Sequence, residues 1–156
     1  MGYTINVHNE GNFLHLRVTG SVSPENVAGY MAEGIARCAE LHVPNVLIEE
    51  DLAGRTLDMH TLHRIVSRAA QAARAAVRNV AYVNVSPDHD PELLRFAENV
   101  ATNRSVNVRV FRNVAEAKAW LEFHSRTDAD DDVSAPGRAA RGQPVAGPRP
   151  PQDEPA

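Results

Sequence analysis

The chain has 156 residues and a formal net charge of −4, with 16 basic and 20 acidic side chains. Because non-specific nucleic-acid binding needs a basic surface, this balance argues against a nucleic-acid partner. The single cysteine, Cys38, excludes an intramolecular disulfide and a zinc site built from cysteines. No apolar run reaches the roughly 18 residues of a membrane-spanning helix, and Met1 leads into a predicted strand, so we expect a cytoplasmic protein without membrane insertion.

Alternating apolar residues predict two antiparallel strands at the start of the chain, over residues 3–8 and 13–18. The polar segment 9–12 contains a glycine and joins the two strands as a hairpin. The aliphatic residues at the even positions of the second strand should share one face of the sheet.

A helix is predicted next, because Ser23 is a good N-cap and Pro24 suits the first helical position. Apolar residues then recur at every third or fourth position from Val27 to Leu41, which is the pattern of an amphipathic helix. Pro44 prevents this helix from continuing.

One stretch in the middle of the chain organises the rest. Its apolar run 46–48 predicts a strand that is covered on both faces and ends at the acidic run 49–51. Thr56 or Asp58 can then cap a helix over about residues 57–77. Open α/β sheets bind ligands and partners outside the carboxyl ends of their strands, so we expect any site of this protein here.

The remaining elements continue the alternation of strands and helices. Residues 79–85 predict a strand, Pro91 begins a helix that reaches residue 102, and residues 106–111 predict a last strand. Asn113 caps a final helix. The predicted order is ββαβαβαβα, which is typical of an α/β fold with a mostly parallel sheet and right-handed crossovers.

The composition changes sharply at residue 125. The last 32 residues contain six of the ten prolines and an acidic run at 128–132. Such a segment cannot bury enough apolar surface to offset the loss of chain entropy. We therefore predict a folded domain over residues 1–124 and a disordered tail over residues 125–156.

Three segments carry a resemblance to a known family: residues 51–54 after the third strand, residues 86–90 after the fourth, and the closing strand and helix over residues 107–121. Together they look like the STAS superfamily, and in particular the stand-alone SpoIIAA-like, or STAS/SEC14-type, bacterial proteins. The resemblance covers about residues 3–123. It implies the SpoIIAA-like fold, in which an N-terminal antiparallel hairpin strand joins a mostly parallel sheet with four helices.

The resemblance implies a non-catalytic regulatory domain that acts by protein–protein interaction, as an anti-sigma-factor antagonist does. In the phosphorylated members of the family, a serine begins the helix after the third strand and meets a partner kinase. Here the corresponding positions are Asp58 and Met59, so that serine is missing. Thr56 is the candidate phosphoacceptor that remains nearby.

We predict a partner-binding surface on this turn and on the helix that follows it. Its residues are Gly54, Arg55, Thr56, Asp58, Met59, His60, Arg64 and Arg68. The helix carries four arginines with no acid after Asp58 to offset them, which favours an acidic protein partner; a solvated helix surface is the alternative. An anti-sigma factor, a kinase, another regulator and a second copy of the chain all remain candidate partners.

Two other functions compete with protein binding. One is a small-ligand or lipid-binding module, as the SEC14-type relatives suggest. The other is a metal-assisted enzyme built from Asp51, Asp58, His60, His63 and His89. The two helical histidines are three residues apart, whereas a helical zinc pair is four apart with a glutamate between. We therefore predict no metal, no other cofactor and no catalytic residues.

Overall fold

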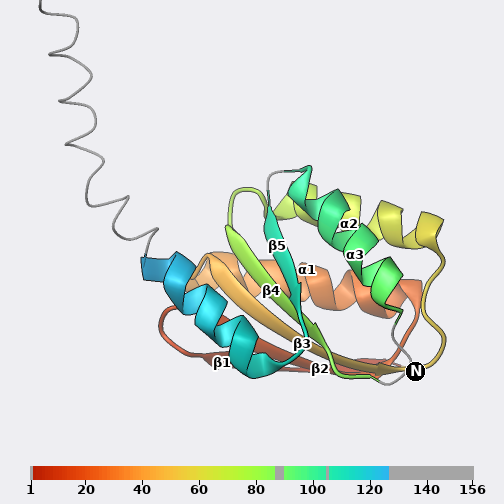
Figure 1. Cartoon of the computed structure of the whole chain (residues 1–156), viewed down its shortest axis with the longest axis horizontal. Coiled ribbons are helices and arrows are strands. Elements are labelled where there is room, and N and C mark those ends of the chain that lie inside the picture. Colours follow the sequence, from red (N-terminus) through yellow and green to blue (C-terminus); the bar gives the residue numbers. More distant parts are fainter. Residues whose placement is uncertain (1, 87–89, 105, 127–156) are drawn as a thin grey trace, which may run out of the picture. The chain divides into compact units, whose positions relative to one another are not determined.

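The computed structural model describes residues 2–86, 90–104 and 106–126 (Figure 1). The elements are β1 (Tyr3–Asn9), β2 (Leu14–Ser21), α1 (Pro24–Leu41), β3 (Asn45–Ala53), α2 (Met59–Ala73), β4 (Asn79–Asn84), α3 (Pro91–Thr102) and β5 (Asn107–Phe111). A C-terminal helix follows over residues 114–126. The predicted order of elements is confirmed. The predicted tail lies outside the described residues from residue 127 onwards.

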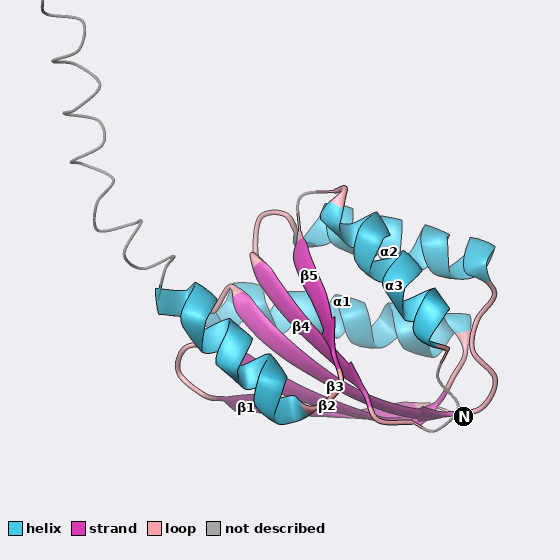
Figure 2. Cartoon of the chain, viewed as in Figure 1, coloured by secondary structure: helices cyan, strands magenta, loops and turns pink. Residues whose placement is uncertain are grey.

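The five strands form one sheet in the order β1-β2-β3-β4-β5. β1 pairs with β2 in the antiparallel sense, and every other neighbouring pair is parallel. Each crossover steps in the same direction across the sheet, so right-handed connections place α1, α2 and α3 on one face. The C-terminal helix covers the opposite face (Figure 2).

Both faces of the sheet are buried against helices, and the strands supply the two cores from alternate positions. Leu14 and Leu16 of β2 pack in the core beneath α1 and α2. Phe13 and Leu47 face the other way and pack against Leu121 of the C-terminal helix. The predicted sharing of one face by the even positions of β2 is therefore confirmed.

The predicted caps Ser23 and Asn113 are confirmed, and Asp58 and Asp90 cap α2 and α3. Ser23, Asp58, Asp90 and Asn113 each accept a hydrogen bond from a backbone N–H two or three residues later, over 2.8 to 3.0 Å. Each such cap stabilises its helix by about 1 kcal/mol. Of the two candidate caps for α2, Asp58 is the one that the chain uses.

Two predicted boundaries were wrong. β3 continues to Ala53, where it pairs with Ser21, so the acidic run 49–51 lies within the strand and not after it. The acids fit there because successive side chains point to opposite faces of a strand. α2 is shorter than predicted at both ends, because Asp58 fixes its start and the chain turns after Ala73.

An asparagine ladder joins the amino ends of three parallel strands. Asn45, Asn79 and Asn107 are register partners on β3, β4 and β5. The Asn79 amide donates to the Asn45 side-chain oxygen over 2.8 Å, and the Asn107 amide donates to that of Asn79 over the same distance. The ladder fixes the register of the strands that carry the candidate site.

None of the helices in the described part of the chain has the length and apolar content needed to cross a membrane.

Candidate functional site

A buried carboxylate lies on the face of the sheet that the three helices cover. Glu50 belongs to β3 and shares this face with Val46, Ile48 and Leu52, because alternate strand residues point the same way. Its relative exposure is 7%. Glu50 is thus an acid at a position of the strand where the alternating pattern predicts an apolar side chain.

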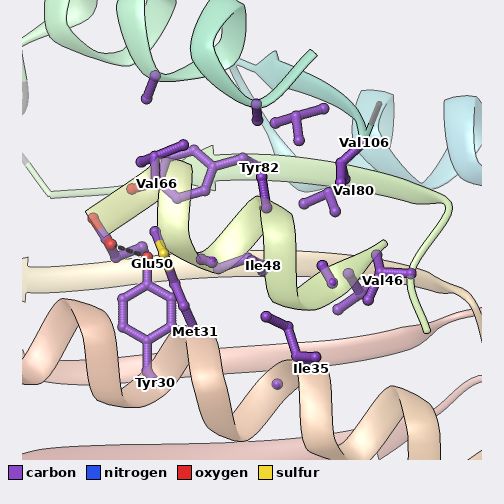
Figure 3. A pocket seen from close by; sticks show the side chains of 18 of the residues that line it. Tyr30, Met31, Ile35, Val46, Ile48, Glu50, Val66, Val80, Tyr82 and Val106 are labelled. Carbon is purple, nitrogen blue, oxygen red and sulfur yellow. Dashed lines mark hydrogen bonds between the residues drawn. The ribbon is translucent and has the colours of Figure 1, made fainter. Parts of the chain in front are cut away.

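Three neutral side chains surround this carboxylate. The Tyr30 hydroxyl of α1 donates a hydrogen bond to Glu50 Oε2 (Figure 3). Asn84, the register partner of Glu50 on β4, donates from Nδ2 to Glu50 Oε1 over 2.9 Å and to the Tyr82 hydroxyl over 3.3 Å. The cluster therefore joins α1, β3 and β4 through hydrogen bonds.

Burial dominates the electrostatics of the cluster. It raises the pKa of Glu50, and the hydrogen bonds from the Tyr30 and Tyr82 hydroxyls lower that pKa in part. Burial and the neighbouring Glu50 charge raise the pKa of both tyrosines well above the usual range, so they stay neutral donors. Among the described residues, no basic side chain forms an ion pair with Glu50.

A cavity of about 140 Å³ lies between the sheet and the three helices, and Glu50 is part of its lining. Figure 3 shows Glu50 with Tyr30 and Tyr82 at one side of the cavity and Val46 and Val106 at the other. Its aliphatic lining includes Met31, Ile35, Ile48, Val66, Val80 and Val108. The cavity is thus apolar along most of its length and polar where the cluster lies.

Short side chains leave this space open. Ala69, Ala70 and Ala73 line the cavity from α2, and Ala97 and Ala101 line it from α3. Because an alanine side chain extends only one carbon from the backbone, these helices cover the sheet without filling the volume beneath them. The alanine-rich face of α2 was visible in the sequence, but the cavity required the position of the helix over the sheet.

Cys38 contributes its thiol to the cavity lining. It is 1% exposed and forms no disulfide. Burial raises its pKa to about 11, so the thiol is protonated near neutral pH and is a poor nucleophile.

The predicted partner-binding residues lie on the surface beyond the end of β3. Arg55, Asp58, Met59, His60, Arg64 and Arg68 are exposed, Thr56 is half-buried, and Gly54 turns the chain with a φ of 112°. Asp58 is occupied as the cap of α2, and hydrogen bonds from the Thr61 backbone and hydroxyl lower its pKa. The structure keeps these residues together in one surface segment, separate from the buried cluster.

The residues of the rival metal site are distributed differently. Asp51 lies within β3, His89 falls outside the described residues, and the His63 ring packs 6.0 Å from that of Phe96. Within the described ranges, no three histidine, cysteine, aspartate or glutamate side chains come together as metal ligands.

Sequence reasoning noted the acids of β3 but missed the cluster that Glu50 forms. One signal was available, since Glu50 continues the two-residue apolar period of Val46 and Ile48. Tyr30 likewise occupies the apolar face of α1. A polar group in an apolar period marks a buried polar site, but its partners depend on the fold.

No protein-family model and no curated protein matches the chain. Among solved structures, the chain is similar to an uncharacterised protein of the DUF3478 family from Shewanella loihica, which is described as having a SpoIIAA-like fold. The two chains are 18% identical with a TM-score of 0.49, and the similarity covers 77% of this chain and 94% of the other.

Proposed function

We propose that this domain binds a small, mostly apolar ligand in the cavity between the sheet and helices α1, α2 and α3. The observation that carries the proposal is the cavity itself, with its aliphatic lining and the Glu50 cluster at one side. Ligand sites in proteins are commonly apolar pockets with a few polar groups that orient the ligand. The volume of about 140 Å³ accommodates on the order of ten water-sized groups.

The energetics of the cavity favour an occupant. Cores of proteins are close-packed, and an empty apolar cavity of about 140 Å³ costs about 3 kcal/mol of stability. A ligand of matching size recovers that energy by restoring dispersion contacts with the lining. Binding, and not catalysis, is the function that this arrangement supports.

A first test is native mass spectrometry of the full chain after gentle purification from cells. We expect a retained small molecule that is released when the protein unfolds. We also expect octanol to bind and to raise the Tm, because binding to the folded state alone shifts the unfolding equilibrium. A protein that retains nothing and is not stabilised by octanol would contradict the proposal.

A cavity-filling substitution tests the location. Ala69 lines the cavity from α2, whereas Ala72 on the same helix is exposed, so Ala72→Leu is a matched control for Ala69→Leu. We expect Ala69→Leu to weaken octanol binding by roughly tenfold or more, since each displaced methylene contributes about 0.8 kcal/mol. Titration calorimetry measures both variants. Equal affinities for the two variants would place the ligand elsewhere.

A second candidate function is protein binding through the predicted surface segment. It is favoured by Met59, whose relative exposure of 52% leaves an apolar side chain among charged neighbours. Methionine and arginine are both enriched at protein interfaces. Arg64 and Arg68 lie on the following turns of α2 and are exposed.

Charge reversal tests this second candidate. We expect the double variant Arg64→Glu and Arg68→Glu to lose a salt-sensitive partner in affinity capture from the native cytoplasm. The double variant Arg95→Glu and Arg112→Glu, at exposed positions elsewhere, should keep that partner. A partner retained by both double variants would remove α2 as the contact surface.

A further inference from the structure

The charges around the cavity have one sign. Glu50 and Glu98 are both among its lining residues, and in the described part of the chain that lining includes no arginine, lysine or histidine. Glu98 Oε2 accepts a hydrogen bond from the Val110 backbone N–H over 2.8 Å, which ties α3 to β5. Glu50 is bound by uncharged donors alone, so its charge has no opposite charge beside it among the described residues.

We propose that the ligand of this cavity is an aliphatic amine whose ammonium group pairs with the Glu50 carboxylate. The inference rests on the proposed ligand-binding function and names its ligand class. A buried charge is costly unless an opposite charge pairs with it, and a cationic head group supplies that charge. Hydrogen bonds between ammonium and carboxylate are shorter and stronger than those between neutral groups.

The hydrogen bonds of Glu50 leave room for such a head group. An ionised carboxylate offers about four acceptor positions on its two oxygens. Tyr30 donates to Oε2, Asn84 donates to Oε1, and the Tyr82 hydroxyl is a third hydrogen-bonding neighbour. A further donor that enters from the cavity can therefore bind the carboxylate without displacing these partners.

The shape of the cavity fits an aliphatic tail behind the head group. From Glu50 the lining continues through Ile48 to Val46 on the same face of β3. The four residue-to-residue steps of strand between Glu50 and Val46 span about 13 Å. A tail that extends from Glu50 toward Val46 would contact aliphatic side chains from the sheet and the helices (Figure 3).

Three probes with the same tail separate the chemistry of the head group from that of the tail. Octylamine is cationic, octanol is neutral and octanoate is anionic near neutral pH. We expect octylamine to bind the full chain roughly tenfold or more tightly than octanol, and octanoate to bind most weakly. Titration calorimetry gives the affinities. The shift in Tm provides a second readout, since a ligand that binds the folded state alone raises the Tm.

Substitutions test which carboxylate causes the preference for octylamine over octanol. Glu50→Gln should remove most of the difference between octylamine and octanol. Glu49→Gln should keep it, because Glu49 is bonded to His15 over 2.9 Å and does not line the cavity. Glu98→Gln should also keep it. Loss of the preference in Glu98→Gln, with retention in Glu50→Gln, would overturn the assignment to Glu50.

The outcomes distinguish this inference from the function on which it rests. Octanol or octanoate binding as tightly as octylamine in the unmodified protein would overturn the amine and leave cavity binding intact. If none of the three probes binds or raises the Tm, both proposals fail. Should Glu50→Gln not fold, the comparison of the three probes on the unmodified protein decides the head group by itself.

Discussion

At the scale of single residues, Glu50 differs most from what its surroundings favour. It occupies an apolar position of β3, and burial raises its pKa because the charged form is poorly solvated there. Hydrogen bonds from Tyr30 and Asn84 reduce this cost but supply no positive charge. A protein that keeps a carboxylate in such a position either tolerates a loss of stability or uses the charge, and our proposals assign it a use.

The raised pKa predicts how stability depends on pH. Because the pKa of Glu50 is higher in the folded than in the unfolded protein, the folded protein holds the Glu50 proton more tightly. The contribution of this proton to the free energy of unfolding is therefore full below the unfolded-state pKa and is lost as pH rises through the folded-state pKa. Glu50→Gln removes this contribution. We therefore expect the stability of the variant relative to the original protein to rise with pH, by about 1.4 kcal/mol for each unit of pKa shift.

Urea unfolding of both proteins between about pH 4 and about pH 8 measures this difference. Tyr30 and Tyr82 are also titratable and lie near Glu50, but burial raises both pKa values well above the pH range of this experiment. Glu98 is a further titratable group, because it lines the same cavity. Glu98→Gln is the control that separates the two carboxylates. A pH-independent difference for Glu50→Gln would contradict the raised pKa.

At the scale of elements, the asparagine ladder and the alanine faces of α2 and α3 have opposite effects. The ladder holds β3, β4 and β5 in register through side-chain hydrogen bonds. The alanines leave space above those strands, which weakens packing. The sheet is therefore fixed at its amino edge, while the volume between sheet and helices stays available.

The middle residue of the ladder should contribute most to stability. Asn79→Ala would leave the side-chain oxygen of the buried Asn45 without its donor, and a buried polar group without a partner costs about 1–3 kcal/mol. We expect a loss of that order in chemical denaturation. The exposed Asn6 of β1 provides the control, and Asn6→Ala should change stability by less than about 0.5 kcal/mol. Similar losses in the two variants would show that the ladder contributes little.

At the scale of the whole molecule, the cavity results from an arrangement that no single element contains. Three consecutive crossovers in one direction place α1, α2 and α3 on the same face of the sheet. The opposite face is closed by the C-terminal helix through Ala117 and Leu121. A ligand site of this kind therefore needs the complete order of strands and helices.

Local patterns in the sequence were enough to predict the order of elements, the helix caps Ser23 and Asn113, and the faces of β2. These features depend on local chemistry, since caps, proline positions and apolar periods act within a few residues. The sequence placed the end of β3 too early, because a run of acids resembles a loop when burial on each face is unknown. The surface segment from Gly54 to Arg68 stays a prediction.

The candidate ligand site became visible in the folded structure and not in the sequence. Asn84 lies 34 residues from Glu50 in the chain, and Tyr30 lies 20 residues from it. Their contact depends on the register of two parallel strands and on the rotation of α1 over the sheet, neither of which a local pattern specifies. The same holds for the cavity, because short side chains create space only where the helices that carry them are held away from the strands by longer neighbours.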